Sequence, residues 1–179
     1  SQPTLTDGKL REPVLRLLQW LRLVNVSSTD GAWRFPDLSG SDQLGQAPLR
    51  SPSVFNFFRP GYVPPNTAVA RMGLVAPEFQ VTNESSVMGY ANFLLGIMPF
   101  GGNGILPHYD AWLALADNPA RLVDQLNLHL SGRVLSPATV STVVAGVSAI
   151  LGTSPNERLN RVVAAFFLIM CCPEYLVQR

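Results

Sequence analysis

The stretch that decides the fold class is Ser154-Pro-Asn-Glu-Arg-Leu-Asn-Arg-Val-Val-Ala-Ala-Phe-Phe-Leu-Ile-Met-Cys171. Its first residues favour a helix start, because Ser154 and Glu157 have the spacing of a capping box and a proline occupies the first helical position. Apolar residues dominate from Leu159 to Met170 and leave hardly any polar face. We therefore expect this segment to form the central, buried helix of a group of helices.

Two earlier positions repeat the same signal for a helix start. Asn118 and Ser136 each precede a proline, and each supplies a side-chain acceptor for the first turn of a helix. Gly132 and Gly152 stand where a left-handed residue ends a helix. A short helix over 110–117 is predicted before this series.

The first half of the chain contains two more predicted helices. Apolar residues recur at three- and four-residue spacing over 10–26, which is the pattern of an amphipathic helix. A second helix is predicted over 83–98, with Thr82 or Asn83 as its cap. Small and polar residues share one face of this second helix, namely Ser85, Gly89, Asn92 and Gly96. Because a glycine inside a helix costs up to ~1 kcal/mol relative to alanine, we expect a close neighbour on this face, a helix rather than a ligand.

Residues 27–82 have a different character, with many prolines and glycines and no sustained helical or strand period. Their aromatic residues can anchor the segment to a core, which argues against disorder. These aromatic residues are Trp33, Phe35, Phe55, Phe57, Phe58, Tyr62 and Phe79. We predict a mainly α fold, a bundle of about five to six helices with a long, ordered, irregular arm. The single domain 1–179 would comprise a helix over 1–26, the arm over 27–82 and the bundle over 83–179.

The composition restricts the class of partner. Hydrophobic residues make up 47% of the chain and charged residues 14%, against roughly 25% charged residues in an average soluble domain. This low proportion of charged residues indicates that part of the protein surface becomes buried. The net charge of +1 lacks the excess of basic residues that a nucleic acid requires, so we predict no nucleic-acid partner. The longest apolar run, Val162 to Cys172, is shorter than the ~20 residues of a membrane-spanning helix, so we predict no membrane span.

The residues that carry metal or nucleophile chemistry are few. The two histidines are His108 and His129, and His108 with Asp110 provides only two potential ligands, where a metal site needs three or four. The adjacent Cys171 and Cys172 suggest neither a disulfide framework nor a ligand pair. The sequence has no GxSxG motif for a serine nucleophile. We therefore predict neither a metal nor a cofactor.

A small set of polar and aromatic residues is the candidate functional cluster: Arg59, Tyr62, Glu78, Asn83, Glu84 and Asn92. Glu78 and Glu84 could act as paired carboxylates, although the charge of Glu84 also suits the first turn of a helix. Arg59 could hold an anionic group, or it could stack on a neighbouring aromatic ring in a purely structural role. No catalytic residue is assigned.

Four segments of the sequence form long and specific motifs. They are Leu44-Gly-Gln-Ala-Pro-Leu-Arg-Ser-Pro-Ser-Val-Phe-Asn-Phe-Phe-Arg-Pro-Gly-Tyr-Val-Pro-Pro65, Leu74-Val-Ala-Pro-Glu-Phe-Gln-Val-Thr-Asn83, Cys172-Pro-Glu-Tyr-Leu-Val-Gln-Arg179 and Lys9-Leu-Arg-Glu-Pro-Val14. Together they resemble the C-terminal portion of the bacterial family called domain of unknown function 1800. Cys172 stands where the family commonly has serine, which changes little beside the following proline.

This resemblance implies a longer protein with an N-terminal portion that is missing here. Members of the family are often exported, so it also implies a periplasmic or secreted location. A further implied partner is a protein of the family called domain of unknown function 1501, which is commonly encoded beside these proteins. The resemblance assigns no catalytic residues.

Three classes of function remain open at this point. The first is a non-catalytic structural or interaction portion of an exported bacterial protein. Of the enzymatic and non-enzymatic interpretations of this chain, we favour the non-enzymatic one. The second is a hydrolase-like enzyme with a site at the seam with the missing N-terminal portion, to which Arg59, Glu78, Asn83 and Glu84 would contribute. The third is a polymer- or glycan-binding module that uses Trp33, Phe58 and Tyr62 as stacking platforms.

Overall fold

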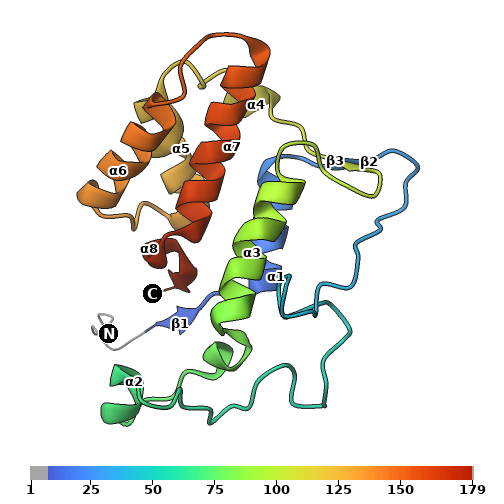
Figure 1. Cartoon of the computed structure of the whole chain (residues 1–179), viewed down its shortest axis with the longest axis vertical. Coiled ribbons are helices and arrows are strands. Elements are labelled where there is room, and N and C mark those ends of the chain that lie inside the picture. The colour runs from blue at the N-terminus through green and yellow to red at the C-terminus, as the bar shows by residue number, and fades with distance from the viewer. Residues whose placement is uncertain (1–7, 179) are drawn as a thin grey trace. The chain divides into compact units, whose positions relative to one another are not determined.

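The structure is a computed structural model, and it describes residues 8–178. Within this range the chain forms eight α-helices, one 3-10 helix and four strands of two residues each (Figure 1). The mainly α prediction is confirmed. No helix within residues 8–178 combines the length and the apolar composition that crossing a bilayer requires.

The chain divides into two compact units. The first unit comprises residues 1–17, 35–93 and 177–179, and the second comprises residues 18–34 and 94–176. Two helices, α1 (Pro13–Leu23) and α3 (Glu84–Ile97), contribute residues to both units. The grouping of the chain as a single domain stays a prediction.

The second unit is built around the helix that the sequence places at its centre. This helix, α7 (Pro155–Cys171), contacts α4 (Asp110–Leu113), α5 (Pro119–Ser131), α6 (Pro137–Ser148) and α8 (Pro173–Leu176), and Figure 1 shows α5, α6 and α7 as one group. Its buried residues are Arg161, Val162, Val163, Ala165, Phe166, Ile169 and Met170. Phe166 lies edge-on to the rings of Tyr109 and Trp112, with centroids 5.9 and 5.3 Å away. The aromatic core of this unit therefore forms on α7.

The helix starts of the second unit follow the capping signals in the sequence. The side chain of Asn118 accepts a hydrogen bond from the backbone N of Arg121 at 3.0 Å, and Ser136 Oγ accepts one from Thr139 N at 3.2 Å. Ser154 forms the predicted capping box with Glu157. These bonds satisfy N–H groups that have no partner within the helix.

A buried arginine connects several helix ends of the second unit. Arg161 donates hydrogen bonds to the carbonyl oxygens of Ala116 at 2.8 Å, Ile150 at 3.1 Å and Gly152, and to Asp117 Oδ1 at 3.1 Å. Its guanidinium therefore satisfies the carbonyls that follow α4 and α6, which have lost their helical partners.

Two short strand pairs complete the described chain. In the first unit β1 (Lys9–Leu10) pairs antiparallel with β4 (Val177–Gln178). In the second unit β2 (Ser27–Ser28) pairs antiparallel with β3 (Ile105–Leu106). The start of the expected arm is therefore part of a strand pair.

The first unit contains most of the irregular segment that the sequence indicates. Between residues 35 and 83 the regular elements are α2 (Ala68–Arg71) and the 3-10 helix η1 (Pro77–Val81). Its fully buried anchors are aliphatic, Leu38 and Leu44, whereas Phe55 is exposed. The expectation that aromatic side chains anchor the irregular segment was wrong at Phe55 and also at Trp33, which is 58% exposed.

The capping box of α7 provides a test of the local helix signals. Replacement of Ser154 by alanine removes an N-cap, and we expect the free energy of unfolding to fall by about 1 kcal/mol. Urea denaturation measures the change. The matched control is Ser141→Ala in the middle of α6, which is exposed and should change the value by no more than about 0.5 kcal/mol. Equal effects of the two variants would contradict the cap assignment.

The same cap predicts a pH dependence. Hydrogen bonds from the Ser154 side chain and backbone hold the pKa of Glu157 below its ordinary value of 4.5. A lowered folded-state pKa stabilises the fold above the unfolded-state pKa, and this contribution is lost as the pH falls through the folded-state value. We therefore expect Glu157→Gln to lower the free energy of unfolding at pH 7. Below about pH 4.5 this difference from the unsubstituted chain should shrink progressively in urea titrations. A stability difference that stays constant down to strongly acidic pH would exclude this linkage.

Candidate functional site

The segment of residues 38–47, here called the anchor loop, fixes the irregular part of the first unit. Leu38 O accepts hydrogen bonds from both Leu44 N and Gln46 N at 3.2 Å, which closes the loop on itself. Both leucines are buried, with Ala47 beside them in sequence buried as well. Just outside the loop, Arg50 pairs with Asp37 at 3.0 Å. The bonds that Ser39 donates to Asp37 are the largest cause of a lowered pKa at that carboxyl, and Arg50 lowers it further.

Gln46 attaches the anchor loop to the start of α1. Its side chain is only 3% exposed. Gln46 Oε1 accepts a hydrogen bond from Val14 N at 3.2 Å, and Gln46 Nε2 donates one to Glu12 Oε2 at 2.5 Å. Val14 N lies in the first turn of α1, where a backbone donor has no partner within the helix. A side chain from a distant part of the sequence therefore caps this helix.

Arg16 forms a second contact that ties α1 to α3 within the first unit. Its side chain is buried, Arg16 Nε donates to Arg11 O at 2.8 Å, and its guanidinium carbon lies 4.4 Å from the centroid of the Tyr90 ring. This distance suits a cation–π interaction, which gains strength where water is excluded.

Gly89 gives the anchor loop room to approach α3. A Cβ atom at this position would lie 2.5 Å from the backbone carbon of Asp42, so no side chain fits there. At Gly89 the small and polar face of the helix thus receives the backbone of a loop, where the sequence suggested a neighbouring helix. The expected close approach is confirmed at Gly89 and was wrong at Gly96, where a Cβ atom would meet nothing within 4 Å.

Three residues of the predicted functional cluster lie on segments that the structure joins. Arg59 is exposed, and its backbone N donates to Gln80 Oε1 at 2.8 Å. The carbonyl of Tyr62 accepts from Ala76 N at 2.9 Å. Glu78 lies half-buried on η1, in the stretch bounded by these two contacts.

The other three residues of the cluster belong to α3 and its cap. Asn83 Oδ1 accepts from Ser86 N and Ser86 Oγ accepts from Asn83 N, each at 2.9 Å, so Asn83 caps the helix. Glu84 and Asn92 are exposed on the helix. Within residues 8–178 no hydrogen bond or ion pair joins the side chains of the six cluster residues to one another. Their shared functional role stays a prediction.

The two histidines contact residues outside the candidate functional cluster. Ser27 Oγ and His108 Nε2 lie 2.7 Å apart, and His108 N donates to Val24 O at 2.8 Å, so this histidine fastens the residues after β3 to those around β2. His129 lies edge-on to Trp112. Among the described residues no group of three or more histidine, cysteine or acidic side chains is arranged to hold a metal ion.

A comparison with protein-family models assigns the chain to a family. The model described as "Protein of unknown function (DUF1800)" matches residues 1–177. The chain belongs to this family. No curated protein and no solved structure is significantly similar to this DUF1800 chain.

The family motif at residues 44–65 of this DUF1800 chain contains a structural residue, Gln46, that was not predicted from the sequence. Gln46 stands among Leu44, Gly45 and Ala47, and an amide within a run of small and apolar residues is a signal of a buried hydrogen bond. The amide of Gln46 has neither the charge nor the aromatic ring that connects a side chain most directly with chemistry.

The role of Gln46 can be measured with a matched pair of substitutions. Gln46→Met keeps the approximate volume but leaves Val14 N without its acceptor, so we expect the free energy of unfolding to fall by about 1–3 kcal/mol. The control is Gln43→Met, because Gln43 Oε1 is buried and has no hydrogen-bond partner among the described residues. This control should be neutral or stabilising in the same urea titration. A loss at position 43 as large as that at position 46 would show that side-chain shape, not the hydrogen bond, is what matters.

Proposed function

We propose that this chain is a non-catalytic interaction portion of a longer DUF1800 protein, and that residues 48–76, here called the docking arm, bind a protein surface. The observation that carries this proposal is the exposure of large apolar side chains on the arm. Leu49 is 105% exposed, Val54 95% and Phe55 67%. Single exposed apolar residues are ordinary, but several large ones within one short segment, here residues 49–55, favour an interaction site.

The charges of the docking arm indicate the chemistry of its partner. The arm carries Arg50, Arg59 and Arg71 and has no acidic residue. Arg50 is engaged with Asp37, whereas Arg59 and Arg71 are exposed. An apolar surface bordered by carboxylates would complement this pattern, because opposite charges at the edge of an interface steer association and fix its register.

The docking arm is held in a defined conformation before any partner arrives. Asn56 N donates to Ser53 O at 3.2 Å and Tyr62 N donates to Arg59 O at 3.0 Å, which closes two turns. The bond between Tyr62 and Ala76 then closes the arm on itself, and the bond between Arg59 and Gln80 ties it to the segment before α3. A surface ordered in advance loses less conformational entropy on binding, which favours affinity.

The partner we propose first is the N-terminal portion that the family resemblance implies. A protein of the family called domain of unknown function 1501 is the second proposed partner, and a periplasmic or secreted setting is part of the same proposal. In this view Asn83 serves as a helix cap, and Phe58 and Tyr62, which are half-buried, support the arm.

The proposal predicts that a negative charge on the arm weakens binding. We expect Phe55→Asp to weaken binding of the chain to a separately produced DUF1800 N-terminal portion by at least ~10-fold, about 1.4 kcal/mol, as measured by titration calorimetry. An aspartate there removes an apolar contact and repels an acidic rim. Circular dichroism should show an unchanged fold, since Phe55 contributes little to the core.

Leu151→Asp provides the matched control, because Leu151 is 81% exposed but lies outside the arm in the second unit. It should bind as the unsubstituted chain does. Equal losses in the two variants would place the interface elsewhere. Failure of the unsubstituted chain to bind the N-terminal portion would exclude that partner, and ANS fluorescence no higher than that of ordinary globular proteins would argue against an accessible apolar surface at all.

A further inference from the structure

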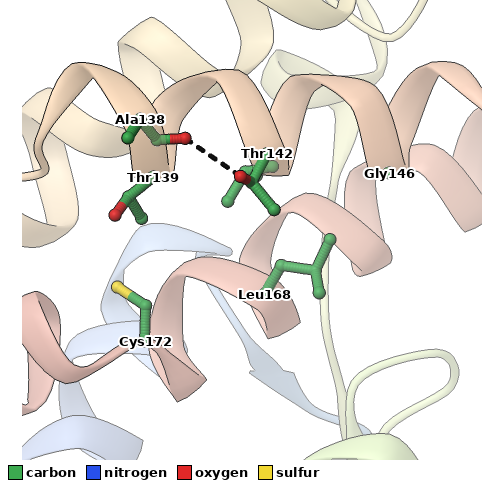
Figure 2. A pocket seen from close by; sticks show the side chains of 7 residues that line it. Ala138, Thr139, Thr142, Gly146, Leu168 and Cys172 are labelled. Carbon is green, nitrogen blue, oxygen red and sulfur yellow. Dashed lines mark hydrogen bonds between the residues drawn. The ribbon is translucent and has the colours of Figure 1, made fainter.

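The second unit contains a trough between α6 and α7 that the proposed docking function does not use. Its volume is about 430 Å³, within the range of roughly 300–1,000 Å³ that small-molecule sites occupy. Figure 2 shows the side chains that surround it. The lining residues are Ala138, Thr139, Thr142, Val143, Gly146, Leu168 and Cys172.

The trough is elongated along the helices. Thr139, Thr142 and Gly146 follow one another at i, i+3 and i+7 on α6, which corresponds to about 10 Å along the helix axis. Leu168 and Cys172 provide the opposite wall at i and i+4. A long, narrow space of this kind fits an extended chain better than a compact ring.

Gly146 lets the two walls of the trough approach closely at one end. A Cβ atom at this position would lie 3.2 Å from Leu168 Cδ1, so even a methyl group would press on the opposite wall. A larger side chain at position 146 would therefore fill this end of the trough.

The hydroxyl groups of the lining already have partners inside the protein. Thr142 Oγ1 donates to Ala138 O at 3.0 Å, which Figure 2 marks. Thr139 Oγ1 lies 3.0 Å from Ser136 Oγ. Because these bonds are internal, an occupant gains little from polar groups along its length, and its body should be apolar.

The two ends of the trough differ in polarity. Thr139 and Cys172 lie at one end, and Gly146 and Leu168 lie toward the other (Figure 2). At the first end Glu174 accepts a hydrogen bond from Ser136 N at 3.2 Å. Hydrogen bonds from Thr139 and Ser136 lower the pKa of Glu174, so the carboxylate is ionised at neutral pH. A second negative charge placed beside it would be repelled.

We propose that the trough binds an unbranched aliphatic chain whose polar head is neutral or cationic, as in a long-chain alcohol or amine, and that it discriminates against the anion of a fatty acid. The apolar chain lies between α6 and α7, and the head lies at the end formed by Thr139 and Cys172.

The binding test uses the whole chain and three probes with the same eight-carbon tail, namely 1-octanol, octylamine and octanoate. Methyl-resolved NMR titration should show saturable shifts at Val143 and Leu168 with the alcohol and the amine, and at least 10-fold weaker binding of octanoate. Binding should also slow modification of Cys172 by a thiol reagent in a Cys171→Ser background. Absence of saturable shifts with all three probes, or equal binding of octanoate, would overturn the proposal.

Two pairs of variants locate the site. Gly146→Leu fills the apolar end and should weaken octanol binding at least 10-fold, whereas Ala145→Leu, an exposed neighbour outside the trough, should leave it unchanged. If Gly146→Leu does not fold, Thr142→Phe blocks the trough from its exposed side, with Ser141→Phe as its control. Octanol binding that survives the folded blocking variant would contradict the assignment.

Sedimentation of the chain without ligand completes the test. Concentration-dependent dimerisation that Thr142→Phe abolishes and Ser141→Phe does not would mean that a second copy of the chain fills the trough, and the small-ligand proposal would fail. A monomer with an open trough supports it.

Discussion

The second unit depends on the solvation of one buried charge, the guanidinium of Arg161. A buried cation is tolerated only where dipoles and counter-charges replace the lost water. Here the replacement consists of the carbonyls of Ala116, Ile150 and Gly152 together with the carboxylate of Asp117. The same carboxylate also pairs with Arg158 at 3.2 Å. The arrangement couples the position of α7 to the chain that leaves α4 and α6, because displacement of any one element would leave both the cation and several carbonyls without partners.

In the first unit, a backbone group without a helical partner is satisfied by a side chain that is distant in the sequence. The first turn of α1 has backbone donors without helical partners, and Gln46 provides one acceptor from 32 residues away. Gly89 then permits the same loop to touch α3. These contacts are few, and each depends on the loop reaching one defined place. The unit therefore relies on specific non-local contacts, whereas the helices of the second unit start by local rules and their ends are then joined by Arg161.

This difference explains how much of the fold could be predicted from the sequence. The signals at Asn118, Ser136 and Ser154 lie within four residues of the bonds they specify, so the starts of α5, α6 and α7 could be predicted without knowledge of the remaining structure. The burial of α7 also followed from its composition. By contrast, no local pattern identifies Val14 as the partner of Gln46 or Asp42 as the neighbour of Gly89, because both partners depend on where a long loop folds back.

The candidate site shows the same limit. The cap role of Asn83 could be predicted because its partner, Ser86, is three residues away. The contact between the backbone of Arg59 and the side chain of Gln80 could not, because 21 residues separate the partners. The exposure of Phe55 was likewise hidden, since the hydrophobicity of an aromatic residue does not reveal whether its own chain or another molecule covers it.

The family motif thus combines two different physical roles within one continuous stretch of sequence. Its beginning contains the buried residues Leu44, Gln46 and Ala47, and Gln46 attaches it to α1. Its continuation through Leu49, Val54 and Phe55 is exposed and contributes little to that core. Folding alone accounts for the first part, because loss of Gln46 would leave buried groups without partners. It does not account for the second part, where large apolar side chains face solvent at a cost in solubility. A partner that covers these side chains is the simplest physical reason for the protein to carry them, and the anchor loop would hold the docking arm in position for that partner.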